Sequence, residues 1–113
     1  MRSKIIALSK NEEFKTLLQK KKISNKYVTI FFGNLINKSK SKLNISFVVK
    51  KKLGNAVIRN KTKRRLRNIM NDAIKKISIN LHYSYLVIAK PTMLNSEFNI
   101  IKETLFREFE RIH

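Results

Sequence analysis

A long helix is predicted from Asn55 to about Lys76, and it constrains the whole fold because one of its faces must be covered. Its apolar side chains repeat at steps of three and four residues, which places them on one helix face. These are Leu66, Ile69, Met70, Ala73, Ile74 and Ile77. Such a stripe is buried against another layer of structure. The helix is therefore expected to pack on a core along this stripe.

The residues around the start of this helix are strongly basic. Residues 50–67 hold nine lysine and arginine residues and no acidic one, and Gly54-Asn55 forms a turn between a lysine cluster and the helix. At about 100° per residue, five polar side chains spread over roughly 140° of the helix surface beside the apolar stripe. They are Arg59, Asn60, Lys63, Arg64 and Arg67.

This basic segment suits a polyanion. A guanidinium group can bind two phosphate oxygens at once, and the free amides at a helix N-terminus also attract phosphate. Asn60 adds a donor and an acceptor for a sugar hydroxyl or a base edge. RNA is the expected ligand, and the alternative is a solvated cationic face without a dedicated partner.

The charge of the whole chain supports an RNA ligand. Lysine and arginine number 26 against seven acidic residues, a net charge of +19, whereas residues 96–113 carry three basic and four acidic side chains. The cationic field therefore belongs to the rest of the chain. The absence of cysteine excludes disulfides, thiolate zinc sites and thiol nucleophiles. No apolar run suits a membrane span or a signal peptide, so residues 1–113 are expected to form a single cytoplasmic domain.

Five further elements are predicted around the long helix. Ser9 and Glu12 have the spacing of a capping box for a first helix, on which three apolar residues share a face: Phe14, Leu17 and Leu18. Strands are expected at 27–35, 43–49 and 83–89, with the first two joined by a loop as an antiparallel pair.

A last helix should begin at Asn95 or Ser96, with five apolar residues along one side: Phe98, Ile101, Leu105, Phe109 and Ile112. The predicted order is helix, strand, strand, helix, strand, helix. It indicates an α+β fold, a two-layer α/β sandwich in which helices cover a small mixed sheet of three to four strands.

A catalytic site made by the polypeptide alone is not expected. A nuclease that acts through its own side chains needs clustered carboxylates or histidines to hold metal ions or to move protons. Here Glu12 and Glu13 sit at a helix start, Asp72 is isolated in the sequence, and the histidines are His82 and His113. No catalytic residue and no protein metal site is therefore predicted.

The segment from Lys51 to Arg67 resembles the signature of the bacterial ribonuclease P protein subunit. That signature joins a lysine-glycine turn to an Arg-Asn-Arg core, followed by Lys-Arg and a further Arg. Residues 11–14 resemble the family's first-helix motif, and residues 85–91 its last strand. Lys61 stands where the family usually has the second Arg of the core, so the charge is kept but bidentate geometry is lost.

The resemblance implies the protein component of ribonuclease P, an endoribonuclease whose RNA subunit cleaves the 5′ leader from precursor tRNA. Magnesium ions would be held mainly by the RNA and the substrate, and no protein partner would be needed. The implied fold is ribosomal protein S5 domain 2-like with a left-handed βαβ crossover. The residues implied to bind ribonuclease P RNA are Lys51, Lys52, Arg59, Asn60, Lys61, Lys63, Arg64 and Arg67. The alternative is a ribosomal or general RNA-binding protein without nuclease association.

A second implied surface is a cleft between the first helix and the sheet that binds the single-stranded leader. The resemblance places Phe14 and Leu18 in this cleft, together with one strand face carrying Val28, Ile30 and Phe32. The aromatic position on the strand is either Ile30 or Phe32. Aromatic side chains there would stack on bases, and ordinary core packing is the alternative for Phe14, Leu18, Ile30 and Phe32.

Overall fold

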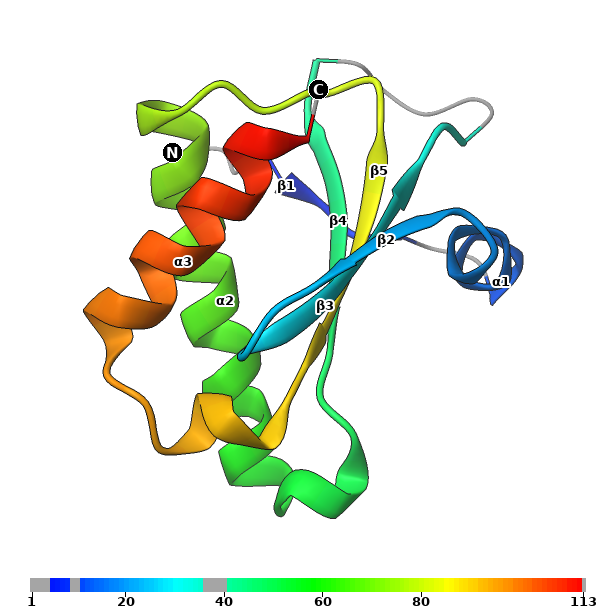
Figure 1. The fold of residues 1–113 in the computed structure, drawn as a ribbon. Helices are drawn as coiled ribbons and strands as arrows, with labels where there is room; N and C mark the ends of the chain where they lie inside the picture. Colours follow the sequence, from blue (N-terminus) through cyan, green and yellow to red (C-terminus); the bar gives the residue numbers. More distant parts are fainter. Residues whose placement is uncertain (1–4, 9–10, 36–40, 113) are drawn as a thin grey trace.

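The computed structural model describes residues 5–8, 11–35 and 41–112. Figure 1 shows an α+β fold, as expected. Its elements in chain order are β1 (Ile5–Ile6), α1 (Asn11–Leu18), β2 (Lys21–Ser24), β3 (Val28–Gly33), β4 (Leu43–Val48), the 3₁₀ helix η1 (Lys51–Leu53), α2 (Ala56–Lys76), β5 (Ser84–Ala89), the 3₁₀ helix η2 (Pro91–Leu94) and α3 (Phe98–Arg111).

The strands form one mixed sheet in the order β1-β4-β5-β3-β2. β5 lies at its centre, parallel to β4 and antiparallel to β3. The sheet has five strands rather than three to four. The two strands that were not predicted give weak sequence signals. β1 has only two residues, and β2 begins with two lysines, Lys21 and Lys22, which are depleted in strands.

The predicted pairing of 27–35 with 43–49 is wrong, because β5 lies between β3 and β4. β5 is apolar on both faces and almost fully buried, which suits the central position of a sheet. β4 and β5 are parallel neighbours joined through α2, so a βαβ crossover is present. Its left-handedness stays a prediction.

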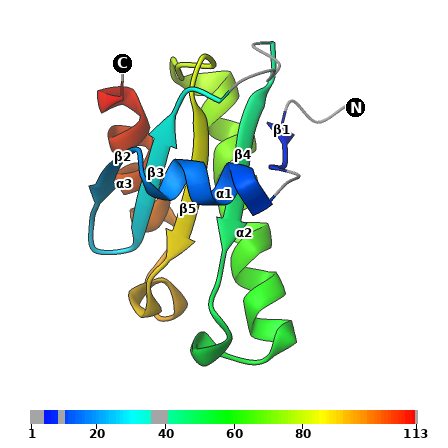
Figure 2. The same ribbon diagram turned by 90° about the vertical axis from the view of Figure 1, so that its right-hand side faces the viewer.

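The helices divide between the two faces of the sheet. α2 and α3 cover one face, and the short α1 crosses the other (Figures 1 and 2). The main core lies under α2 and α3, where the rings of Tyr85 and Phe109 are 5.2 Å apart. A smaller cluster lies under α1 and is centred on Leu8, Leu17 and Leu86.

The stripe predicted for the long helix is confirmed. Leu66, Ile69, Met70 and Ala73 are buried, and Ile74 and Ile77 are partly buried. On α3, the residues Ile101, Leu105, Phe109 and Ile112 are buried and Phe98 is partly buried. A 2.6 Å ion pair between Lys102 and Asp72 also joins α3 to α2.

The helix starts agree only in part with expectation. Asn55 caps α2, since its Oδ1 accepts a hydrogen bond from the Ile58 amide at 3.0 Å. The start of α3 differs, because the N-cap is Glu97 and, within the described chain, its side chain makes no capping bond. Ser96 instead donates its hydroxyl to the Thr92 carbonyl at 2.6 Å. Ser9, predicted to cap α1, lies outside the described residues.

Candidate RNA-binding surfaces

The first candidate surface is the basic arc of α2, which we define as Arg59, Asn60, Lys63, Arg64 and Arg67. Asn60, Arg64 and Arg67 are exposed, while Arg59 and Lys63 are half-buried beside the apolar stripe. Because the stripe is fixed on the core, the arc is held at one flank of the helix, as the helical spacing predicts. The structure thus places these five side chains on one continuous surface.

A tight turn joins two further cations to the start of α2. Gly54 has φ +158°, and a Cβ atom there would lie 2.8 Å from Cγ2 of Ile58. This backbone region favours glycine. Lys51 and Lys52 lie in η1 immediately before the turn, and both are exposed. The turn and the Asn55 cap therefore fix the two lysines relative to α2.

Lys61 lies at the border of the basic arc, about 60° from Arg64 around the helix axis. Its side chain lines a hollow together with Arg65 and with Leu94 of η2. Seven of the eight residues implied to bind ribonuclease P RNA therefore belong to the arc and to the turn before it, and Lys61 extends this set toward the hollow.

A hollow of about 510 Å³ joins the basic arc to α1 around one edge of the sheet. β1 pairs only with Leu43 and Asn44, so β4 is the edge strand from Ile45 onwards. Lys63 and Arg67 line the hollow together with Phe14 of α1. Cations from one face of the sheet and an aromatic ring from the other therefore meet across this edge.

The strand face predicted for the leader cleft is wrong. Val28, Ile30 and Phe32 belong to the main core under α2 and α3, on the face of the sheet away from α1. Val28 and Ile30 are 0% exposed and Phe32 is 8% exposed. Successive side chains in a strand alternate between faces, so a shift of one residue reverses the face. The aromatic residue of β3 on the α1 side is Phe31, which packs in the smaller cluster.

The strand register defines the face that does lie beside α1. Phe31 is opposite Leu86, and Ile88 is opposite both Thr29 and Val48. Directly opposed residues share a face of the sheet. Leu86, Val48 and Ile88 belong to the same cluster as Phe31 of β3 and Phe14 of α1. We call the surface formed by these four strand residues and Phe14 the α1-side face.

The three apolar residues predicted to share one face of α1 differ in how deeply they are buried. Leu17 is fully buried and anchors the helix on the sheet. Phe14 is half-buried at the edge hollow, and Leu18 is 47% exposed. Of these three apolar residues, Phe14 and Leu18 therefore keep accessible surface, and their place in a leader-binding cleft stays a prediction.

A polar cluster borders the far end of the α1-side face. Lys90 donates from Nζ to the Ser24 hydroxyl at 2.6 Å and also to the Asn25 carbonyl. Ser24 is opposite Thr29, which is on the same face as Ile88. Sequence reasoning missed Phe31, Val48, Ile88 and Lys90, because this face is defined by the pairing of β5 with β3 and β4, which are distant from it in the sequence.

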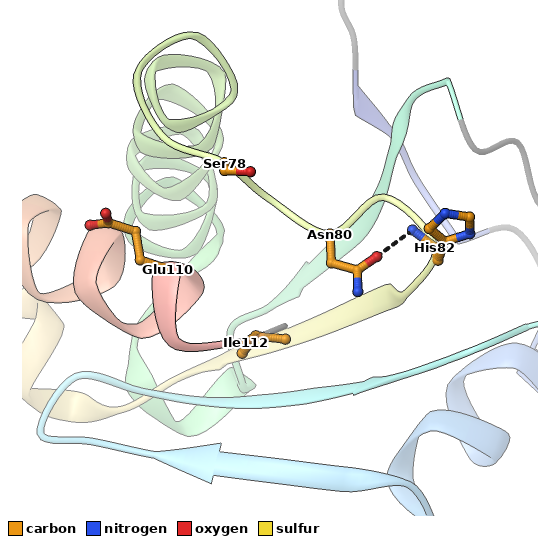
Figure 3. A pocket seen from close by; sticks show the side chains of 5 residues that line it. All are labelled: Ser78, Asn80, His82, Glu110 and Ile112. Carbon is orange, nitrogen blue, oxygen red and sulfur yellow. Dashed lines mark hydrogen bonds between the residues drawn. The ribbon is translucent and has the colours of Figure 1, made fainter.

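A separate hollow of about 530 Å³ lies between the loop after α2 and the end of α3. His82 and Glu110 both line it, but Figure 3 shows their side chains at opposite ends of it. Asn80 accepts a hydrogen bond from the backbone amide of His82 at 2.9 Å, so this contact leaves the imidazole uninvolved. The hollow therefore does not bring an acid and a base together.

The described residues hold no cluster of three or more histidine, aspartate or glutamate side chains suited to a metal ion. Within the same part of the chain, none of the helices is long and apolar enough to cross a bilayer. Burial raises the pKa of Tyr85, whose hydroxyl donates to the Asn80 carbonyl at 2.6 Å. That tyrosine therefore serves as a structural donor in the core.

Comparison with known proteins gives one consistent result. The family model described as Ribonuclease P matches residues 3–113. A ribonuclease P protein component from Carboxydothermus hydrogenoformans is 34% identical over 102 residues, covering 87% of this chain and 83% of that protein. A ribonuclease P protein component from Bacillus cereus strain Q1 is 30% identical over 105 residues, covering 92% and 88%.

Solved structures agree on the fold. The ribonuclease P protein from Thermotoga maritima superposes with a TM-score of 0.80 at 24% identity, covering 96% of this chain and 98% of that one. The ribonuclease P protein of Staphylococcus aureus gives a TM-score of 0.76 at 25% identity, covering 94% and 93%. The similarity therefore extends along nearly the whole length of both chains.

Proposed function

Since the chain belongs to the ribonuclease P protein family and functions in tRNA 5′ processing, we propose that it does so as the RNA-binding subunit of a ribonucleoprotein whose RNA carries out the cleavage. The single observation that supports this division of labour is the basic arc. It is a set of four cationic side chains and one amide suited to phosphate, and within the described residues no group of three or more carboxylates and histidines suited to a metal ion accompanies it.

The proposed contact with the catalytic RNA is made by the basic arc and by the lysines of η1. The Nε atom of Arg59 is buried and, among the described residues, has no hydrogen-bond partner. An unsatisfied buried donor costs about 1–3 kcal/mol, so a small movement of Arg59 onto a phosphate would gain a bond that the free protein lacks. The free protein thus leaves Arg59 prepared for a ligand.

We place the 5′ leader of precursor tRNA on the α1-side face and the edge hollow. Phe14, Phe31 and Ile88 are half-buried there, so each ring or apolar group still presents surface to a base. Stacking contributes roughly 1–3 kcal/mol per base. The hollow connects this face to Lys63 and Arg67, so a leader bound there would lie beside the catalytic RNA.

Magnesium is proposed to be held by phosphates of the two RNAs. The ion prefers oxygen ligands in octahedral geometry and is commonly bound together with substrate phosphates. The described residues hold no group of three or more acidic or histidine side chains that could bind a metal ion, and the surface beside the proposed RNA is cationic. The cationic side chains of the protein would offset the repulsion between phosphates of the two RNAs. Less magnesium would then be needed for the RNA to cleave its substrate. A cytoplasmic location remains a prediction.

Equilibrium binding tests the proposed partner. Affinity for a bacterial ribonuclease P RNA should exceed affinity for an unrelated structured RNA of equal length, and both should fall with salt because counterions are released. Equal affinity for the two RNAs would favour the alternative, a general or ribosomal RNA-binding protein.

A further inference from the structure

A second group of cations lies on and around β2, at the edge of the sheet opposite the edge hollow. We call it the lysine edge; its members, all exposed, are Lys20, Lys21, Lys22 and Lys26. Within the described part of the chain, none of them forms an ion pair. The sequence also has no acidic residue between Glu13 and Asp72. The charges of the lysine edge are therefore available to an anion.

Local contacts hold two of these lysines in place. A Cβ atom at Gly33 of β3 would lie 2.8 Å from Cγ of Lys20, so the stem of Lys20 passes close over the backbone of Gly33. The Nζ atom of Lys26 lies over the Tyr27 ring, 5.8 Å from its centre. A side chain that is already held loses less conformational entropy when it binds a ligand.

A row of accessible side chains connects the edge hollow to the lysine edge. Val48 lines the hollow and is opposite Ile88 of β5. Ile88 is opposite Thr29 of β3, which is opposite Ser24 of β2. Ser24 is exposed and the other three are half-buried. Lys22 is two residues from Ser24, so it is on the same face of the strand. The row therefore ends at the lysine edge.

The length of this row sets how much RNA it can hold. Neighbouring strands lie about 4.7–4.9 Å apart, so the path from β4 across β5 and β3 to β2 spans roughly 14–15 Å. Stacked nucleotides advance about 3.4 Å each along one strand, so about four of them cover this distance. Figure 2 shows α1 crossing the same face from the β4 side to the β2 side. A single strand of RNA could thus follow α1 from one edge of the sheet to the other.

Building on the proposed function, we infer that the lysine edge binds phosphates of the leader about four or more nucleotides upstream of those at the edge hollow. The leader is 5′ to the cleavage point, so its first upstream nucleotides lie beside Lys63 and Arg67, and later ones lie toward β2. Lysine acts on phosphate as a point charge and does not read a base. This contact therefore adds affinity according to leader length and not leader sequence.

A leader-length series tests the lysine edge in the reconstituted complex. The variant Lys21→Gln, Lys22→Gln should weaken binding of a precursor with a leader of about ten nucleotides, and leave binding unchanged for a leader of about three. For the long leader, the slope of log K against log[salt] should fall by about 1.4, the value for two contacts to single-stranded RNA. Unchanged binding of the short leader also shows that the variant is folded.

The matched control is Lys75→Gln, Lys76→Gln, which removes two exposed lysines from the end of α2. It should bind both precursors as the unmodified chain does. No loss on the long leader, an equal loss on both leaders, or an equal loss in the control would overturn the inference.

Cross-linking tests the path of the leader. The chain has no cysteine, so Lys22→Cys provides a single site for a photoreactive label, and Lys76→Cys provides the control. The label at position 22 should cross-link leader nucleotides about four or more positions upstream of the cleavage point, and the control should cross-link none. Cross-links from position 22 only to the catalytic RNA or mature tRNA, or none, would contradict the inference. If the unmodified chain gives no preference for precursor over mature tRNA, the proposed leader site fails instead.

Discussion

Phe31 and Phe32 are neighbours in β3, yet their rings lie on opposite faces of the sheet. The Phe32 ring is 5.4 Å from the Tyr83 ring and 6.4 Å from the Tyr85 ring, in the core under α2 and α3. The Phe31 ring packs in the cluster under α1. This one-residue distinction separates a core aromatic from one that can face RNA.

The two phenylalanines should therefore respond differently to truncation. Phe32→Ala should lower the free energy of unfolding by about 3–5 kcal/mol, as expected for a buried aromatic. Phe31→Ala should cost less stability, because part of its ring is already in water. It should instead lower the preference for leader-bearing precursor over mature tRNA about tenfold, through loss of one stacked base.

Urea unfolding and binding of both tRNA forms to the reconstituted complex measure these effects. A Phe31 variant that weakens both tRNA forms equally would assign the ring to packing alone.

The basic arc should dominate affinity for the catalytic RNA. The double variant Arg59→Ala, Arg64→Ala should retain its helix content, because neither side chain belongs to the apolar stripe of α2. Its RNA affinity should fall, and its salt slope should decrease by about 1.4–1.8 as two phosphate contacts are lost. Circular dichroism and filter binding across a salt series check both parts. An unchanged affinity would show that the arc is only a solvated surface.

Gly54→Ala should disturb the turn that places Lys51 and Lys52. The added Cβ would meet Ile58, and the backbone there favours glycine, so we expect a loss of about 1–3 kcal/mol in unfolding free energy. RNA affinity should also fall because the lysines move relative to the arc. Urea unfolding and RNA binding measure the two effects, and wild-type values for both would contradict the role of the turn.

The Lys102–Asp72 contact predicts an acid-sensitive link between α2 and α3. The hydrogen bond from Lys102 lowers the pKa of Asp72 below its usual 3.8. A carboxyl with a depressed pKa stabilises the fold above its unfolded pKa, and this contribution is lost as pH falls through the folded pKa. Lys102→Met should raise the pKa of Asp72, which NMR titration of the carboxyl measures. A pKa that does not rise would show that the contact is absent in solution.

Helix geometry was predictable from sequence, and sheet geometry was only partly so. The apolar stripe from Leu66 to Ala73 is a local pattern, so it identified α2 and the position of its basic arc. β3 carries apolar side chains on both faces, so alternation could not tell Phe31 from Phe32. Pairing also depends on β5, which is distant in sequence and separates β3 from β4. The arc could therefore be predicted, while the α1-side face required the register.

Cleavage of precursor tRNA at low magnesium is the most direct test of the central claim. A bacterial ribonuclease P RNA should process the precursor slowly by itself under these conditions. Adding this chain should accelerate release of the 5′ leader, and the Arg59→Ala, Arg64→Ala variant should accelerate it less at equal concentration. A rate that is the same with and without the unmodified chain would contradict its role as the protein subunit.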